Sequence, residues 1–122
     1  MRIFIASSNR TLRSAVQLLV DGEPGMVVTG IADRAESLLT LVGASQPDAL
    51  LLDNELTKQV SGNLISALHH LEAAPKIVVF STDPHVKATT LASGADAFIS
   101  MNIPPDDLLP ILRGMRLSAT IR

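Results

Sequence analysis

DALLLDN, at residues 48–54, is a continuous apolar run that ends on an acidic residue. A run of this kind predicts a strand that is buried on both faces, as in a parallel sheet covered by helices. Pro47 precedes the run, where it does not disturb the ladder of hydrogen bonds. Ligands of open α/β sheets bind beyond the carboxyl ends of the strands, so Asp53 is a candidate functional residue. The alternative is that Asp53 is a polar residue that only terminates the strand.

The segments on either side of this run alternate between strand and helix patterns. Short apolar runs predict four more strands, over residues 2–6, 26–31, 76–80 and 95–100. Apolar residues at helical spacing predict helices over residues 11–20, 64–71 and 85–93 and a fifth helix after Pro105. They also predict a second helix that contains the apolar residues of 38–42 and ends near Gly43. This alternation predicts the α/β class, with a doubly wound, five-stranded parallel sheet and five helices.

Helix-capping patterns stand before three of the predicted helices. One of the polar residues 7–9 can cap the first helix. Asp33 with Glu36 three residues later forms a capping-box pattern before the second. Asp83 followed by Pro84 predicts the N-cap and first position of the fourth.

The remaining segments are less regular. Residues 54–62 predict a polar loop with one glycine. His69 and His70 lie near the end of the third predicted helix and are interpreted as a solvated helix end rather than as metal ligands. Pro110 lies one turn inside the fifth helix if that helix starts at Pro105, where it should bend the helix or delay its start.

Composition limits the possible functions. The chain has 122 residues, of which 47% are hydrophobic and 2% aromatic, so one domain with an aliphatic core is expected. Its net charge of −2 argues against nucleic-acid binding by this domain. The chain has no cysteine, which excludes disulfides and thiolate metal sites. No apolar run approaches the length of a membrane span, so we expect a cytoplasmic protein without membrane contact.

The predicted topology gathers several polar residues at one edge of the sheet. Because the carboxyl ends of parallel strands meet there, we expect the following to lie close together: Ser7, Ser8, Asp53, Ser81 and Met101. No glycine-rich phosphate-binding pattern follows the first predicted strand, which argues against a dinucleotide site.

The chain from Met1 to about residue 116 resembles the receiver domain of bacterial two-component response regulators. Asp53 falls on the phospho-accepting aspartate of that family, Ser81 on its hydroxyl position and Phe98 on its switch aromatic position. GADAF at residues 94–98 and PPDDLL at residues 104–109 are similar to receivers that precede a LuxR/NarL-type helix-turn-helix domain. The resemblance implies a flavodoxin-like strand order 2-1-3-4-5, a receiver-like domain over residues 1–117, and a tail or start of a linker over residues 118–122.

The chain departs from the family pattern at the positions that carry charge. Ser7 and Ser8 stand where receivers have an acidic pair, Met101 where they have a lysine, and Thr57 where they have a proline. Phosphoryl transfer depends on neutralising charge, which in the family is done by Mg²⁺ on carboxylates and by the lysine. The resemblance therefore implies weak or absent Mg²⁺ binding and no other cofactor. Asp53 and Glu55 are only weak candidate metal ligands.

Three functional hypotheses remain. The first is an atypical receiver that acts in phosphorelay signalling as a protein-interaction or dimerisation module, without enzyme activity. Its contact face would be the fourth helix, the fifth strand with Phe98 and the fifth helix, and its partner a histidine kinase, an output protein or a second copy. The second is a receiver phosphorylated on Asp53, or the regulatory domain of a DNA-binding transcription regulator. The third is a small flavodoxin-like enzyme or ligand-binding domain, which a deep polar pocket near Ser7, Asp53 and Ser81 would distinguish.

Overall fold

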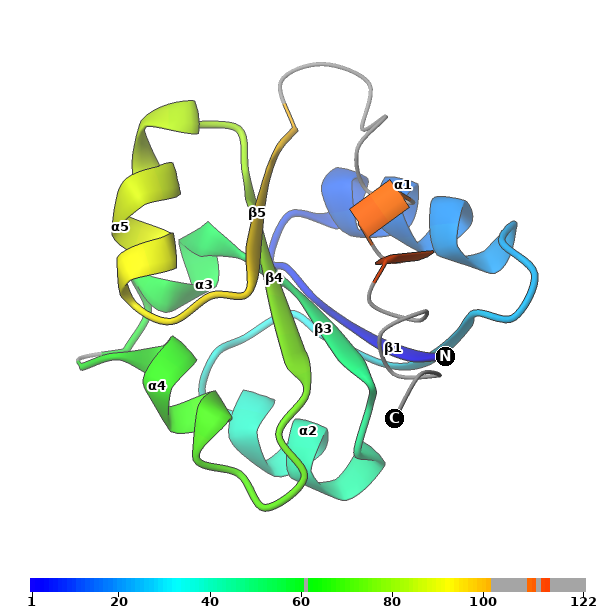
Figure 1. Cartoon of the computed structure of the whole chain (residues 1–122), viewed down its shortest axis with the longest axis horizontal. Coiled ribbons are helices and arrows are strands. Elements are labelled where there is room, and N and C mark those ends of the chain that lie inside the picture. The colour runs from blue at the N-terminus through cyan, green and yellow to red at the C-terminus, as the bar shows by residue number, and fades with distance from the viewer. Residues whose placement is uncertain (61, 102–109, 112, 115–122) are drawn as a thin grey trace.

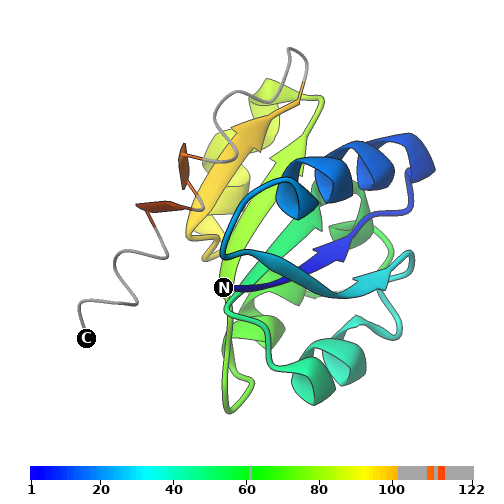
Figure 2. The same cartoon turned by 90° about the vertical axis from the view of Figure 1, so that its right-hand side faces the viewer.

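The sheet has five parallel strands. The computed structural model describes residues 1–60, 62–101, 110–111 and 113–114. Within them the strands are β1 (Arg2–Ala6), β2 (Val27–Ala32), β3 (Ala49–Asp53), β4 (Lys76–Ser81) and β5 (Ala97–Ser100). Their order is β2-β1-β3-β4-β5, and Figure 2 shows β5 and β2 at opposite edges. The predicted fold class and strand order are confirmed.

Helices cover both faces of this sheet. They are α1 (Arg10–Asp21), α2 (Leu38–Ser45), the short α3 (Asn54–Thr57), α4 (Leu64–His69), the 3₁₀ turn η1 (Pro84–Val86) and α5 (Lys87–Ala92). In Figure 1, α1 lies on one side of the strands and α3, α4 and α5 on the other. The two apolar clusters of the core follow this division, one containing Val16 and Val20 of α1, the other containing Leu38 of α2 and Leu68 of α4.

The apolar run at residues 48–54 forms the central strand, as its composition predicts. The side chains of residues 49–52 of β3 are fully buried, and Asp53 at its end is 2% exposed. Alternate residues face opposite clusters, with Leu50 and Leu52 in one and Ala49 and Leu51 in the other. A strand that is covered by helices on both faces has no solvent-exposed face, so polar and apolar residues need not alternate along it. This explains why residues 49–52 are all apolar.

The start of α2 differs from the prediction. The Asp33–Glu36 capping box does not form, because α2 begins only at Leu38 and its N-cap residue Ser37 makes no side-chain cap. Ala35 is instead 3% exposed within the core, and its N–H donates to Gln59 Oε1 at 3.0 Å. This contact joins residues 24 positions apart, so a long-range interaction forms in place of the local capping box. The helix also continues past Gly43 to Ser45.

The predicted polar loop after Asp53 begins with a helical turn. Asp53 acts as the N-cap of α3, since its Oδ1 accepts the N–H of Glu55 at 3.0 Å. Leu56 of this turn is fully buried in the core. The prediction of a loop over residues 54–62 is therefore wrong for the first four of them.

Two close contacts lie at the periphery of the fold. At the edge strand β2, Gly30 lies against the buried ring of Phe4, and an added Cβ would stand 2.5 Å from the ring atom Cε2. At the other end of the chain, Arg113 forms a two-pronged ion pair with Glu23 at 2.7 and 2.8 Å.

The predicted fifth helix, and with it the expected effect of Pro110, lies mostly outside the described residues, as do the tail and the predicted boundary at residue 117. Within the described ranges, no helix is long and apolar enough to cross a membrane.

Candidate functional site

The carboxyl ends of β1, β3 and β4 place three of the predicted residues at one edge. The register pairs Ala6 with Leu52, so the next residue of each chain segment, Ser7 and Asp53, is adjacent. Ser81 closes β4, one position beyond the pairing of Asp53 with Phe80. All three side chains are buried, at 0%, 2% and 4% exposure for residues 7, 53 and 81.

Both carboxylate oxygens of Asp53 accept a hydrogen bond. The Ser7 hydroxyl donates to Oδ2 at 2.6 Å, and the Glu55 N–H donates to Oδ1 at 3.0 Å. The Ser7 Oγ in turn accepts the N–H of Asn9 at 3.1 Å. Asp53 therefore both ends the strand and is held in place by a hydroxyl 46 residues earlier in the sequence.

Arg13 is a neighbour that sequence reasoning missed. Its Nη1 donates to the backbone oxygen of Ser7 at 2.8 Å, so α1 brings a guanidinium to the loop that contacts Asp53. The same helix is capped by Asn9, whose Oδ1 accepts the N–H of Leu12 at 3.1 Å, which selects one of the three predicted caps. A positive side chain near the N-terminus of a helix interacts unfavourably with the helix dipole. The position of Arg13 near the start of the first predicted helix could therefore have indicated that its side chain has a specific partner.

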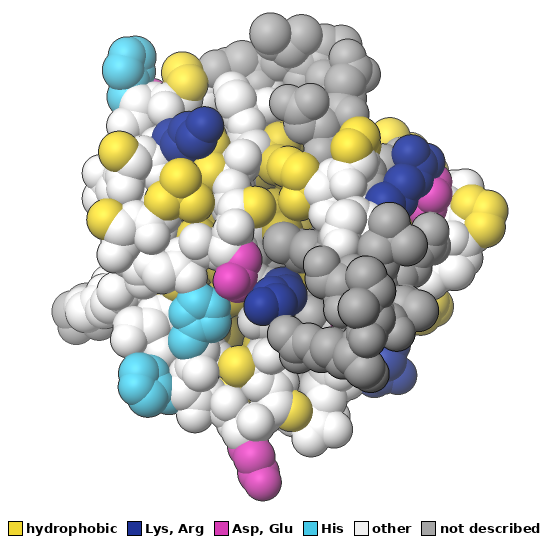
Figure 3. All heavy atoms as spheres, viewed as in Figure 1, with side chains coloured by type: hydrophobic (Ala, Val, Ile, Leu, Met, Phe, Trp, Pro, Cys, Tyr) yellow, Lys and Arg dark blue, Asp and Glu magenta, His cyan; other side chains and the backbone are white. Residues whose placement is uncertain are grey.

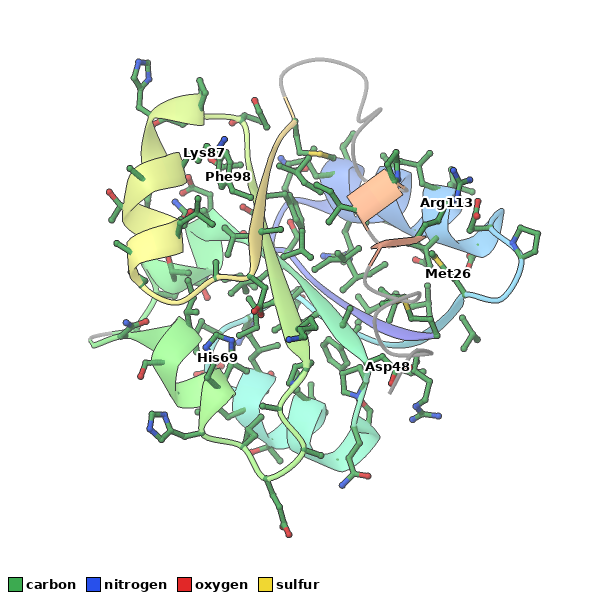
Figure 4. The ribbon with its side chains drawn as sticks, in the orientation of Figure 1. Met26, Asp48, His69, Lys87, Phe98 and Arg113 are labelled. Atoms are coloured by element: carbon green, nitrogen blue, oxygen red, sulfur yellow. The ribbon has the colours of Figure 1, made fainter. Side chains whose placement is uncertain are left out.

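The structure separates the other predicted positions. Ser8 is exposed, and among the described residues the hydrogen bonds to the Asp53 carboxylate come from Ser7 and from the Glu55 N–H, not from Ser8. Ser81 Oγ accepts the N–H of Asp83 at 3.0 Å, and its backbone oxygen accepts the N–H of Met101 at 2.9 Å. The Met101 side chain is half-buried against the cluster beneath α1. Phe98 points from β5 toward α5 in Figure 4 and packs partly on the opposite cluster.

The weak metal candidates do not converge. The Glu55 carboxylate pairs with Lys58 at 3.0 Å on the surface, and only the backbone N–H of Glu55 contacts Asp53. Among the residues that the structure describes, no three His, Asp or Glu side chains come together as they would around a metal ion.

Asp83 caps the helical segment after β4, as predicted. Its Oδ1 accepts the N–H of His85 at 2.9 Å and lies 3.1 Å from the ring Nδ1 of the same residue. The backbone N–H, followed by the His85 side chain, holds the pKa of the Asp83 carboxyl below its usual value. This carboxylate is used as a cap, so the prediction of a capping rather than a metal role agrees with its contacts.

His69 does more than end a helix. Its Nε2 lies 3.3 Å from Asp96 Oδ2, and the same oxygen accepts the N–H of Ile77 at 2.8 Å (Figure 4). His70 is exposed at the helix end, with Nδ1 2.7 Å from the Ser66 backbone oxygen. The prediction of a solvated end therefore holds for His70, whereas His69 joins α4 to the segment before β5.

A pocket lies beside this edge, but none of Ser7, Asp53 and Ser81 lines it. It is bounded by α3, residues 62–63, α4 and α5, with a volume of about 220 Å³. This pocket is therefore not the deep polar pocket that the enzyme hypothesis places at the three predicted residues.

Comparisons with known proteins identify the family. The profile of the response regulator receiver domain matches residues 3–113. The nitrate/nitrite response regulator protein NarL of Escherichia coli (strain K12) is 30% identical over 112 residues, which are 90% of this chain and 52% of NarL. The chain therefore spans about half the length of this relative.

Solved structures agree on the fold. The response regulatory domain of protein mrkE from Klebsiella pneumoniae has a TM-score of 0.85 at 15% identity, with full coverage of both chains. A DNA-binding response regulator of the LuxR family from Staphylococcus aureus has a TM-score of 0.79 at 16% identity, covering 93% of this chain and 97% of that one. The doubly wound sheet, the buried aspartate at the end of β3 and the profile match together place this chain in the family of response regulator receiver domains of two-component systems.

Proposed function

We propose that this chain is an atypical receiver domain, one that transmits signals through protein contacts and is not switched by ordinary Mg²⁺-dependent phosphorylation. The observation that carries the proposal is the 2.6 Å hydrogen bond from the Ser7 hydroxyl to Asp53 Oδ2, between two side chains that are almost completely buried. In this arrangement a hydroxyl donates a hydrogen bond to the acceptor carboxylate, at a position where the family has a metal-binding acid.

The chemistry supports this proposal in two ways. Each carboxylate oxygen of Asp53 already accepts one hydrogen bond, Oδ2 from Ser7 and Oδ1 from the Glu55 N–H. These bonds use one of the two lone pairs of each oxygen, fix the orientation of the carboxylate and make its oxygens weaker nucleophiles. The charge that develops on the transferred oxygens must also be neutralised. Neither the hydroxyl of Ser7 nor the thioether of Met101 carries a positive charge or holds a divalent cation well.

The surface around α5 and β5 is the proposed contact face. Figure 3 shows hydrophobic side-chain atoms over α5 and toward β5, in the part of the molecule that faces the viewer. Leu91 of α5 is 39% exposed, and Phe98 of β5 is half-buried. We propose that a second copy of the chain, or a protein partner such as a histidine kinase or output protein, covers this face.

Sedimentation tests the contact face. Leu91→Glu and Phe98→Glu should weaken self-association, while Asp53→Ala should leave it intact. Leu18→Glu is the matched control, because Leu18 is 74% exposed on α1, on the other side of the sheet. A wild-type chain that stays monomeric at high concentration, or dimers that need both Asp53 and an acyl-phosphate donor, would refute this part of the proposal.

The relatives suggest the larger context. This chain matches about half of NarL, and the Staphylococcus aureus neighbour is described as a DNA-binding response regulator. We propose that the domain serves as the regulatory part of a DNA-binding transcription regulator, with the DNA contact made by a separate domain. The net charge of −2 supports that division of labour.

Magnesium titration followed by NMR tests the missing metal site. In the wild type, millimolar Mg²⁺ should leave the amide signals of Asp53 and Glu55 and the melting temperature unchanged. The variant with Ser7→Asp and Ser8→Asp places like charges near Asp53, so it should be destabilised without metal and recover with Mg²⁺. A Mg²⁺-dependent shift at Asp53 in the wild type would favour the alternative of an ordinary phospho-accepting receiver.

A further inference from the structure

The pocket between α3, α4 and α5 is the feature that the receiver role leaves unexplained. It has a volume of about 220 Å³ and adjoins the residue directly after Asp53. Among the described residues that line it, no side chain is charged. The polar ones are amides and hydroxyls: Asn54, Asn63, Thr57, Thr89, Thr90 and Ser93.

Asn54 is the polar group of this pocket that most needs a partner. The residue is only 7% exposed, and its backbone oxygen accepts the Thr57 hydroxyl at 2.6 Å. Its side-chain Oδ1 lies 3.4 Å from the same hydroxyl. No described residue accepts a hydrogen bond from the Asn54 Nδ2, and this atom is not among the fully buried ones, so it is accessible to solvent or to a ligand. The pocket therefore presents an amide donor without a protein acceptor.

The hydroxyls around the pocket are left as acceptors. Three of them donate their proton to a backbone oxygen, at 2.6, 3.0 and 3.0 Å: Thr57 to Asn54, Thr90 to Lys87 and Ser93 to Thr89. A hydroxyl has one proton and two lone pairs, so each oxygen can still accept from a ligand. One N–H donor and several oxygen acceptors are the complement of a primary carboxamide, which has one carbonyl oxygen and one NH₂ group.

We propose that this pocket binds a small, uncharged ring molecule that carries a primary carboxamide. Its carbonyl oxygen accepts from Asn54 Nδ2, and its NH₂ group donates to the hydroxyl oxygens. Leu64 and Ile65 supply apolar wall for the ring. A cavity of about 150 Å³ accommodates benzene, so 220 Å³ has room for one ring with a small substituent. The uncharged walls and the carboxylate of Asp53 next in sequence disfavour an anion.

Nicotinamide and nicotinate are matched probes, because they differ only in the carboxamide and carboxylate. In NMR titrations of the 122-residue chain, nicotinamide should move the side-chain NH₂ and backbone signals of Asn54 with a Kd of about 1 mM or tighter. Nicotinate should bind at least tenfold more weakly. Asn54→Leu removes the donor and should weaken nicotinamide at least tenfold. Thr40→Val, on the exposed face of α2, is the control and should bind like the wild type.

The comparison of the two probes needs no variant, so it stands even if Asn54→Leu fails to fold. Circular dichroism shows whether that variant is folded, and Thr89→Val, at an exposed position of α5, offers a milder change to the pocket. The proposal is overturned if nicotinamide and benzamide cause no shift at Asn54 at tens of millimolar, or if nicotinate binds as well as nicotinamide. Unchanged binding of nicotinamide to a folded Asn54→Leu variant would also overturn the proposal, because it would show that the Asn54 donor does not contact the carboxamide. None of these outcomes depends on whether Asp53 accepts phosphate.

Discussion

Replacing Ser7 with alanine removes the one side-chain donor that Asp53 has in the described structure. The bond is short, at 2.6 Å, and joins residues with 0% and 2% exposure, so water cannot replace it without rearrangement. A hydrogen bond to a buried charged group contributes about 1.5–3 kcal/mol. For 122 residues the unfolding entropy is about 0.26 kcal/mol per kelvin, so a loss of about 2 kcal/mol lowers the melting temperature by about 8 °C.

Chemical and thermal unfolding followed by circular dichroism measures this loss, since the chain has no Trp or Tyr for fluorescence. Ser8→Ala is the matched control, because Ser8 is exposed next to the mutated position and should change stability by less than about 0.5 kcal/mol. Ser7→Ala also removes the acceptor of the Asn9 N–H. A double-mutant cycle with Asp53→Ala separates the two effects and should give a coupling of about 1.5–3 kcal/mol between residues 7 and 53.

The reasoning fails if Ser7→Ala and Ser8→Ala are equally mild, or if the cycle gives no coupling. Either result would mean that the Ser7 hydroxyl does not hold Asp53 in solution. The proposal that Ser7 restrains the Asp53 carboxylate would then be wrong.

Other predictions follow from the backbone and from helix caps. Gly30→Ala should destabilise the fold by about 1–3 kcal/mol, because its Cβ would meet the buried Phe4 ring at 2.5 Å. Gly43→Ala, in α2 with its nearest outside atom 4.0 Å away, should stabilise it by about 0.5–1 kcal/mol in the same denaturation assay. The Asp83 carboxyl should titrate below its usual pKa by NMR, and still do so in His85→Ala, because the backbone N–H is the largest cause. Since the folded-state pKa is lowered, this cap stabilises the fold above the unfolded pKa and is lost as the pH falls through the folded one.

The sheet could be predicted because its signal is local. Each strand is a short apolar run, and the run ending at Asp53 has no polar residue where a half-exposed strand would need one. The start of α2 could not be predicted, because it depends on Ala35 entering the core and on the bond to Gln59 from another segment. Local sequence patterns predict the structure correctly where the tertiary packing agrees with them. They fail where a residue distant in sequence forms a hydrogen bond with the same backbone group, as Gln59 does with the Ala35 N–H.

The same limit applies to the site. The edge position of Asp53 and Ser81 follows from strand order, and so does the approach of Ser7. The hydrogen bond between Ser7 and Asp53 depends on the register of β1 against β3, which no spacing in the sequence reveals. No sequence pattern singled out Asn54. Its proposed role as a ligand-binding residue rests on its position in the pocket that α4 and α5 also line.

Phosphotransfer to Asp53 is the decisive measurement for the proposed atypical receiver. The chain is incubated with radiolabelled acetyl phosphate, with and without Mg²⁺, beside Asp53→Ala and the variant with Ser7→Asp and Ser8→Asp. We expect no label on the wild type above the level of Asp53→Ala in either condition, because Ser7 restrains the acceptor carboxylate and no acidic pair holds the metal. Mg²⁺-dependent labelling of the wild type that disappears in Asp53→Ala would contradict this expectation.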